Sequence, residues 1–119
     1  MPAGRRWRGV HRGRRPHLVL IMLVTVVILM AAHVAEVVVW ALAYAAVDVV
    51  SAGADPLYFA FVNYTTLGYG DVVPVARWRL IGPITALNGV LMIGWSTAVI
   101  FEVLRTAIRA THGDPGRGA

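Results

Sequence analysis

Apolar residues fall into two long runs with a shorter run between them. The first long run, residues 18–47, contains only two ionisable side chains, His33 and Glu36. As a helix it would be about 45 Å long, which exceeds a hydrocarbon core of about 30 Å and predicts a tilted or overhanging transmembrane helix. A signal peptide is the competing interpretation of a basic N-terminus followed by apolar residues. The run is too long to favour it.

The segment between the long runs, residues 48–79, is more polar and carries turn signals. Asp55 followed by Pro56 is typical of a helix start, with Asp as the N-cap and Pro in the first helical position. The apolar and aromatic run that follows is about half as long as a bilayer crossing requires. We therefore expect a re-entrant half-helix over residues 55–66.

The second long run, residues 80–101, has no charged residue and is long enough to span a membrane. Glycines interrupt it, and glycine in membrane helices allows close packing or bending. We expect this helix to end at Leu104, before a short tail over residues 105–119. Residues 1–17 are rich in Arg, Gly and Pro and predict a basic tail that anionic lipid headgroups would attract.

Composition narrows the class of protein. Hydrophobic residues make up 58% of the chain and charged residues 14%, against about 25% charged in soluble domains. This composition argues against a water-soluble fold and against a disordered chain, which needs low hydrophobicity. The chain has no Cys, which excludes disulfide scaffolds, Cys-ligated zinc and thiol catalysis. The net charge is +5, but Arg gathers at the two ends, which indicates cytoplasmic termini rather than nucleic-acid binding.

The candidate chemistry lies in one segment, which reads TTLGYGD from Thr65 to Asp71. A dehydrated cation in a membrane needs many oxygen ligands, and backbone carbonyls supply them densely when successive carbonyls point the same way. That arrangement needs alternating backbone conformations, with positive φ at Gly68 and Gly70, which glycine adopts without strain. The alternative is a surface turn, because Gly-Tyr-Gly-Asp is also a good turn former.

With this motif between two predicted spans, the chain resembles the pore module of two-helix prokaryotic potassium channels, whose filter is usually written TVGYG. The resemblance covers residues 18–104. It implies an all-α membrane protein with transmembrane helices over residues 18–47 and 80–104, a re-entrant pore helix over residues 55–66 and a filter loop over residues 66–71. It also implies a homotetramer, because one chain supplies only one segment of each ring of carbonyls.

The resemblance further implies the ion-binding residues. The filter would consist of Thr66, Leu67, Gly68, Tyr69 and Gly70. K⁺ would be bound by the backbone carbonyls of the first four and by the Thr66 hydroxyl. The implied partners are other copies of the chain, the lipid bilayer and K⁺, with no nucleic acid and no cofactor.

The chain also departs from the family pattern. Leu67 replaces the commoner Val, and Val62 stands where some members carry an acidic residue behind the filter. Tyr58 and Phe59 replace two adjacent Trp residues. In relatives, a Trp on the half-helix donates a hydrogen bond to the acidic residue after the filter. The resemblance therefore implies that Tyr58 donates to Asp71 and supports the filter.

His33 and Glu36 lie three apart on one helical face within the first span, where ionisable residues are costly. One interpretation is a pH-sensitive pair that biases gating. The other is a hydrogen-bonded pair that locks the first helix against the half-helix or the second span, with Asn63 and Asn88 as candidate partners. In the second span, Gly89 is either a hinge or a close-packing site.

Other polar and aromatic residues in or near the predicted spans have either two possible roles or a structural role. Four copies of Glu102 would form an acidic ring at the cytoplasmic edge, or each would pair with Arg105. Ser96 and Thr97 either line an inner cavity or bond back to their own helix. We expect interfacial anchors at three aromatic positions, Trp40, Tyr44 and Trp78.

The predicted function is passive, potassium-selective conduction across the inner membrane of a cell, with both termini cytoplasmic. An enzyme is not predicted, because the sequence shows no nucleophile–base constellation, metal-ligand spacing or phosphate loop. Abundant Arg, Ala, Val and Gly without Lys are typical of a GC-rich bacterial genome. The alternative functions are a non-selective cation channel and a membrane-anchored protein that regulates a partner without conducting.

Overall fold

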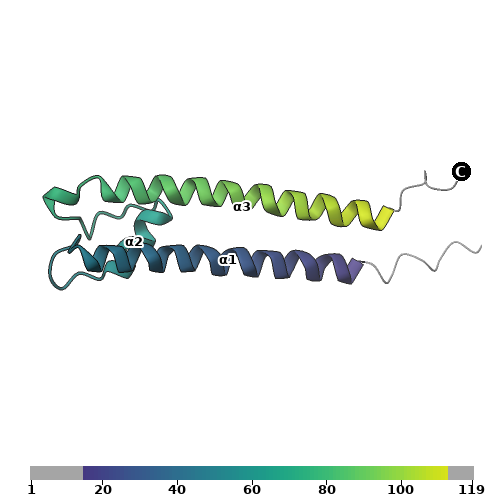
Figure 1. Ribbon diagram of the computed structural model, residues 1–119, viewed down its shortest axis with the longest axis horizontal. Helices are drawn as coiled ribbons and strands as arrows, with labels where there is room; N and C mark the ends of the chain where they lie inside the picture. Colours follow the sequence, from purple (N-terminus) through teal and green to yellow (C-terminus); the bar gives the residue numbers. More distant parts are fainter. Residues whose placement is uncertain (1–14, 113–119) are drawn as a thin grey trace, which may run out of the picture. The chain divides into compact units, whose positions relative to one another are not determined.

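The computed structural model describes residues 15–112 (Figure 1). Its elements follow in the order α1 (Arg15–Ala46), α2 (Pro56–Tyr64), a short 3-10 helix η1 (Ala76–Trp78) and α3 (Ile81–His112). The described residues contain no strand, and an isolated antiparallel bridge joins Val50 to Pro74. The predicted all-α class is therefore confirmed. Two segments are long and apolar enough to cross a membrane, and they include most of α1 and α3.

Both long helices extend beyond their predicted limits. α1 begins at Arg15, before the predicted Leu18, because Pro16 is tolerated in a first turn where its missing N–H breaks no helical bond. α3 continues to His112 and does not end at Leu104. The added residues include neither Gly nor Pro, so nothing in the local sequence stops the helix.

The chain forms two compact units. One unit is Leu29–Thr97, which contains α2, the loops and the adjoining parts of α1 and α3. The other contains the beginning of α1, through Ile28, and the end of α3, from Ala98. In this second unit large apolar side chains such as Leu23 and Phe101 are exposed, as on a helix that faces an apolar surrounding. Residues 1–14 of the first predicted tail and residues 113–119 of the second lie outside the described residues.

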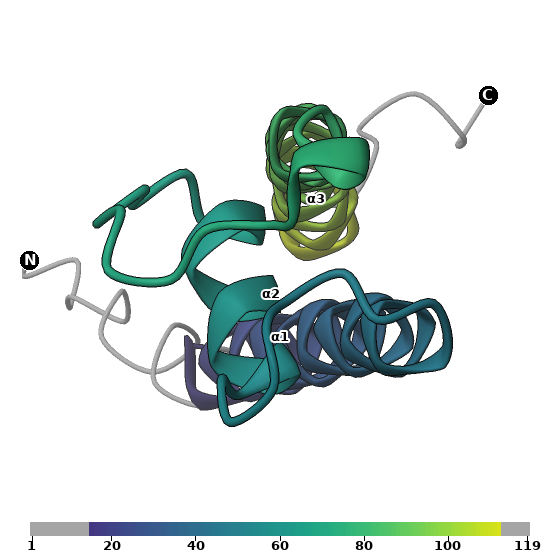
Figure 2. The same cartoon turned by 90° about the vertical axis from the view of Figure 1, so that its left-hand side faces the viewer.

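In the unit Leu29–Thr97, α2 lies beside both long helices (Figure 2) and supplies much of the core. The aromatic rings of Tyr44 and Phe59 pack with centroids 5.3 Å apart, a favourable tilted arrangement. The core of this unit combines side chains of α1, the loop and α2: Val37, Ala41, Tyr44, Val49, Phe59, Ala60 and Tyr64.

Three side-chain hydrogen bonds join α1 to α3 within this unit. The bonded pairs are His33 with Ser96 at 2.9 Å, Trp40 with Asn88 at 3.1 Å, and Tyr44 with Thr85. Residue numbers in these pairs rise along α1 and fall along α3, as expected for antiparallel helices. Tyr44 is only 1% exposed, so the prediction that it anchors at the membrane interface is wrong. The register of the two helices places it opposite Thr85 instead.

Candidate functional site

The start of α2 forms as its local sequence predicts. Asp55 has extended φ and ψ angles, and its carboxylate accepts a hydrogen bond from the Leu57 backbone N–H at 2.8 Å. Pro56 follows as the first helical residue. An N-cap and a proline at this position fix where a helix begins. The beginning of α2 is thus set by neighbouring residues and needs no distant contact.

The end of α2 is tied to the loop that carries the TLGYG sequence. The helix ends at Tyr64, and the chain then folds back on its last turn. The Thr66 N–H donates to the Asn63 carbonyl at 2.9 Å, and the Gly68 N–H donates to the Val62 carbonyl at 3.3 Å. The position of this loop therefore depends on the position of the last turn of α2.

The backbone of this loop alternates in conformation. Thr66, Gly68 and Gly70 have positive φ angles of 62°, 55° and 76°, whereas Leu67 and Tyr69 do not have positive φ. The positive φ predicted at the two glycines is therefore present. Thr66 was not predicted to share it, because a β-branched residue in this region is strained by about 1–2 kcal/mol. Such a conformation persists only where its surroundings hold it.

The N-terminal half of α2 contacts the residue that follows the loop. The Tyr58 hydroxyl donates to the Asp71 carboxylate at 2.5 Å, which is the hydrogen bond that the sequence predicted. This bond lowers the pKa of the Asp71 carboxyl and raises the pKa of the Tyr58 hydroxyl, because it stabilises the charged acceptor and the neutral donor. Both groups are exposed. We call them the Tyr58–Asp71 pair.

The C-terminal end of α2 is held by a larger set of polar side chains. The Tyr64 hydroxyl donates to the Glu36 carboxylate, and His33 Nδ1 lies 2.8 Å from the same hydroxyl. His33 Nδ1 is also 3.6 Å from Glu36 Oε2, and His33 Nε2 lies 2.9 Å from Ser96 Oγ. We call these four residues the Tyr64 network. It joins α1, α2 and α3.

The predicted partners of His33 and Glu36 were wrong. Asn63 donates to the Phe59 carbonyl at 2.7 Å, and Asn88 accepts from Trp40. Tyr64 was not predicted as a partner, because an aromatic residue within an apolar run is usually part of a core. The available signal was its place at the end of the predicted half-helix, where a hydroxyl can reach a neighbouring span.

Gly89 supports the same end of α2 from α3. A Cβ atom built on Gly89 would lie 2.0 Å from the Tyr64 carbonyl oxygen, so only a glycine allows this approach. The contact favours the close-packing interpretation of Gly89 over the hinge. Thr97 Oγ1 donates to the Ile93 carbonyl at 3.0 Å, which is the back-bonding alternative, whereas Ser96 bonds to His33.

Glu102 lies in the other unit and pairs with Arg105. Its Oε2 is 3.7 Å from Arg105 Nη1, with both side chains at least half exposed. An exposed ion pair of this kind contributes at most about 1 kcal/mol to stability. The pairing predicted as one alternative is therefore present, and the acidic ring stays a prediction.

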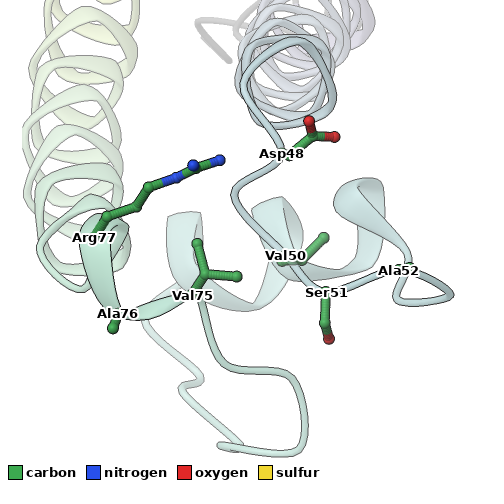
Figure 3. A pocket seen from close by; sticks show the side chains of 7 residues that line it. All are labelled: Asp48, Val50, Ser51, Ala52, Val75, Ala76 and Arg77. Atoms are coloured by element: carbon green, nitrogen blue, oxygen red, sulfur yellow. The ribbon is translucent and has the colours of Figure 1, made fainter.

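A groove of about 560 Å³ lies between the loop after α1 and the segment before α3 (Figure 3). Trp78 Nε1 and Arg77 Nη2 both donate to the Val47 carbonyl beside it, at 3.2 and 3.4 Å. The groove contains no residue of the TLGYG loop; its lining residues are Asp48, Val50, Ser51, Ala52, Val75, Ala76 and Arg77. We assign it no role in conduction.

Comparison with known proteins gives the family. Residues 17–106, which include nearly all of α1, the whole of α2 and most of α3, match a family described as ion channel. The chain belongs to this ion channel family. The two-helix channel module that the sequence predicted is thereby confirmed, and the family indicates ion transport rather than enzymatic catalysis. No curated protein and no solved structure matched the chain.

Proposed function

We propose that four copies of this ion channel chain form a potassium-selective pore whose filter runs from Thr66 to Gly70. The observation that carries the proposal is the alternation of positive φ along TLGYG, at Thr66, Gly68 and Gly70. Alternation of this kind turns successive carbonyls toward one side of the chain, which is the arrangement that replaces the hydration shell of K⁺. A surface turn would not need positive φ at three alternate residues.

Exposure of the loop supports a tetramer. Leu67 and Tyr69 are 57% and 67% exposed in a single chain. Irregular backbone at membrane depth is tolerated only when protein buries it or when it lines a water-filled space. Neighbouring copies would cover these side chains, and the carbonyls of four loops would surround one axis. K⁺ ions along this axis would then be bound by successive rings of oxygens, which the carbonyls of Thr66, Leu67, Gly68 and Tyr69 and the Thr66 hydroxyl supply.

The direction of α2 supports cation conduction. A helix carries partial negative charge at its C-terminal end, and in α2 this end directly precedes the filter. In a tetramer, four such ends would meet below the filter and favour a cation there. The proposed filter and the helix that leads into it therefore favour the same kind of ion.

A matched pair of glycine variants tests the proposal. Gly68 and Gly53 both have positive φ, 55° and 92°, and both have open space where a Cβ would lie. Gly68→Ala and Gly53→Ala both place a Cβ on a residue with positive φ, and Gly53 is the further of the two from the region that other residues adopt, but only Gly68 lies in the proposed filter. In proteoliposomes we expect Gly68→Ala to abolish the preference for K⁺ flux over Na⁺ flux and Gly53→Ala to retain it. Equal K⁺ preference in both variants would contradict the proposed filter.

We also propose that the channel lies in the inner membrane of a cell with both termini in the cytoplasm. Because the native chain has no Cys, single cysteines report position without background. Cysteines at Ala3 and Gly118 should resist an impermeant thiol reagent in intact cells, and one at Ala52 should react. Labelling at either terminal position in sealed cells would reverse the assigned orientation.

A further inference from the structure

Tyr64 is held from three directions where the proposed filter begins. Its hydroxyl contacts Glu36 and His33 of α1, and its carbonyl lies against Gly89 of α3. The side chain is only 2% exposed. A buried group with this many partners has one well-defined position, because leaving any of its hydrogen bonds unmade is costly.

A short stretch of backbone connects Tyr64 to the proposed filter. Thr66 is two residues beyond Tyr64, and its N–H is bonded to the Asn63 carbonyl in the last turn of α2. Thr66 also has the unfavourable positive φ of 62° and would supply the innermost ligands for K⁺. A shift of Tyr64 would therefore change the one filter residue whose backbone most needs external support.

We propose that the Tyr64 network positions the Thr66 end of the filter and thereby sets how long the filter remains in its conducting form. The inference rests on the proposed potassium-channel function. Tyr64 and Glu36 are positioning residues in this account, since they act on the ion through Thr66.

The hydrogen bonds of the network imply a dependence on protonation. Because the Tyr64 O–H donates to Glu36, its oxygen accepts from His33 Nδ1–H, and Ser96 then donates to His33 Nε2. A protonated His33 donates from both nitrogens. Its Nδ1 lies 3.6 Å from the same Glu36 oxygen that Tyr64 uses, so the imidazolium competes with Tyr64 for that carboxylate.

Within residues 15–112, three side chains face His33. They are Glu36 on its own helix, Tyr64 on α2 and Ser96 on α3, of which Ser96 does not titrate. Protonation of His33 on acidification should therefore weaken the Tyr64–Glu36 bond. Openings of the filter should become shorter.

Single-channel recording of the full chain tests the proposal with Tyr64→Phe and its control, Tyr44→Phe. Both changes remove a buried hydroxyl that bonds between elements and keep the ring, but Tyr44 bonds Thr85 of α3 and makes no hydrogen bond to α2. We expect Tyr64→Phe to shorten openings by roughly 13- to 160-fold, the range given by one lost hydrogen bond to a charged group. It should also remove the shortening that follows protonation of His33. Tyr44→Phe should keep wild-type openings and the wild-type pH profile.

Glu36→Gln provides the rescue variant and remains informative if Tyr64→Phe fails to assemble. The Gln side chain keeps an oxygen that can accept from Tyr64 but removes the charge that attracts a protonated His33. Its openings should be as long as those of the wild type near neutral pH and should lose the shortening that follows protonation of His33. His17→Gln, a histidine in the other unit, should leave the acid response unchanged.

The outcomes separate the two proposals. Suppose that the wild type prefers K⁺. If Tyr64→Phe then behaves like Tyr44→Phe, or if Glu36→Gln keeps the acid response, the role of the Tyr64 network alone is overturned. A wild type with no preference for K⁺ would overturn the potassium channel and this inference together.

Discussion

The two ends of α2 are supported in different ways. At one end, Tyr58 makes a single exposed hydrogen bond to Asp71, thirteen residues further along the chain. At the other end, Tyr64 is buried in a network that involves α1 and α3 and lies against Gly89. The Tyr58–Asp71 pair connects α2 to the loop that follows it, and the Tyr64 network connects three helices.

Because of this difference, the exposed contact is expected to affect the proposed filter alone, whereas the buried contact also affects the stability of the fold. Water can replace an exposed hydrogen bond, so losing the Tyr58–Asp71 pair should alter the filter while leaving the assembled protein intact. A buried group that loses its partner is destabilising by about 1–3 kcal/mol. Changes around Tyr64 should therefore affect both stability and conduction.

The largest effect is expected from Gly89→Ala. The new Cβ would meet the Tyr64 backbone carbonyl at 2.0 Å, and backbone cannot rotate away as a flexible side chain can. We expect a loss of about 1–3 kcal/mol or more per chain, seen as a lower unfolding temperature in detergent. Gly94→Ala is the control, because its Cβ meets nothing within 4 Å and alanine favours a helix. Equal stability of the two variants would show that α2 and α3 do not pack this closely.

The next effect concerns the exposed end of α2 and is confined to conduction. Tyr58→Phe and Asp71→Asn should each shorten the openings of the channel while the proposed tetramer stays intact. Because the two side chains bond directly, the double variant should be little worse than either single variant. Recording the three variants in one lipid composition measures this coupling. Additive effects would mean that the pair does not act as a unit.

A smaller effect is expected from pH at the same end. Hydrogen bonding lowers the pKa of Asp71 below its ordinary 3.8, so the contribution of the bond is fully present above about pH 4 and is lost as pH falls through the lowered value. The pKa of Tyr58 is raised above 10.0, so the contribution is lost again only as pH rises through that value. In Glu36→Gln, opening times should be flat from neutral pH to about pH 5 and should fall only in stronger acid. Asp71→Asn should remove that fall.

The smallest effect is expected at a bond that touches neither end of α2. Trp40 donates to Asn88 between α1 and α3. Trp40→Phe keeps an aromatic ring and should lower stability by about 1 kcal/mol, without changing opening times. Thermal unfolding and recording on the same preparation check both parts. A shortened opening would extend the set of positioning residues beyond the Tyr64 network.

The features predicted correctly from the sequence depend on neighbours or on a fixed spacing. Asp55 and Pro56 define the start of α2 by themselves, and Gly68 and Gly70 are residues that adopt positive φ easily. The bond from Tyr58 to Asp71 follows from their separation along a half-helix and its loop. Periodicity and length sufficed for two apolar spans, although not for their ends.

The features that could not be predicted depend on how the helices are aligned. The partners of Glu36 became clear only when the register of α1 against α2 placed Tyr64 beside it. Gly89 had two interpretations until a backbone carbonyl was found where its side chain would be. Intrinsic preference argued against positive φ at Thr66, and the surrounding structure overrides that preference. A single sequence carries little information on such register.

The most direct test of the potassium filter is the reversal potential of the reconstituted wild-type channel between K⁺ and Na⁺ solutions. The proposed filter of carbonyl rings predicts a reversal potential close to the equilibrium potential for K⁺, and block by barium. A reversal potential near zero under the same gradients, with current carried equally by both ions, would contradict it.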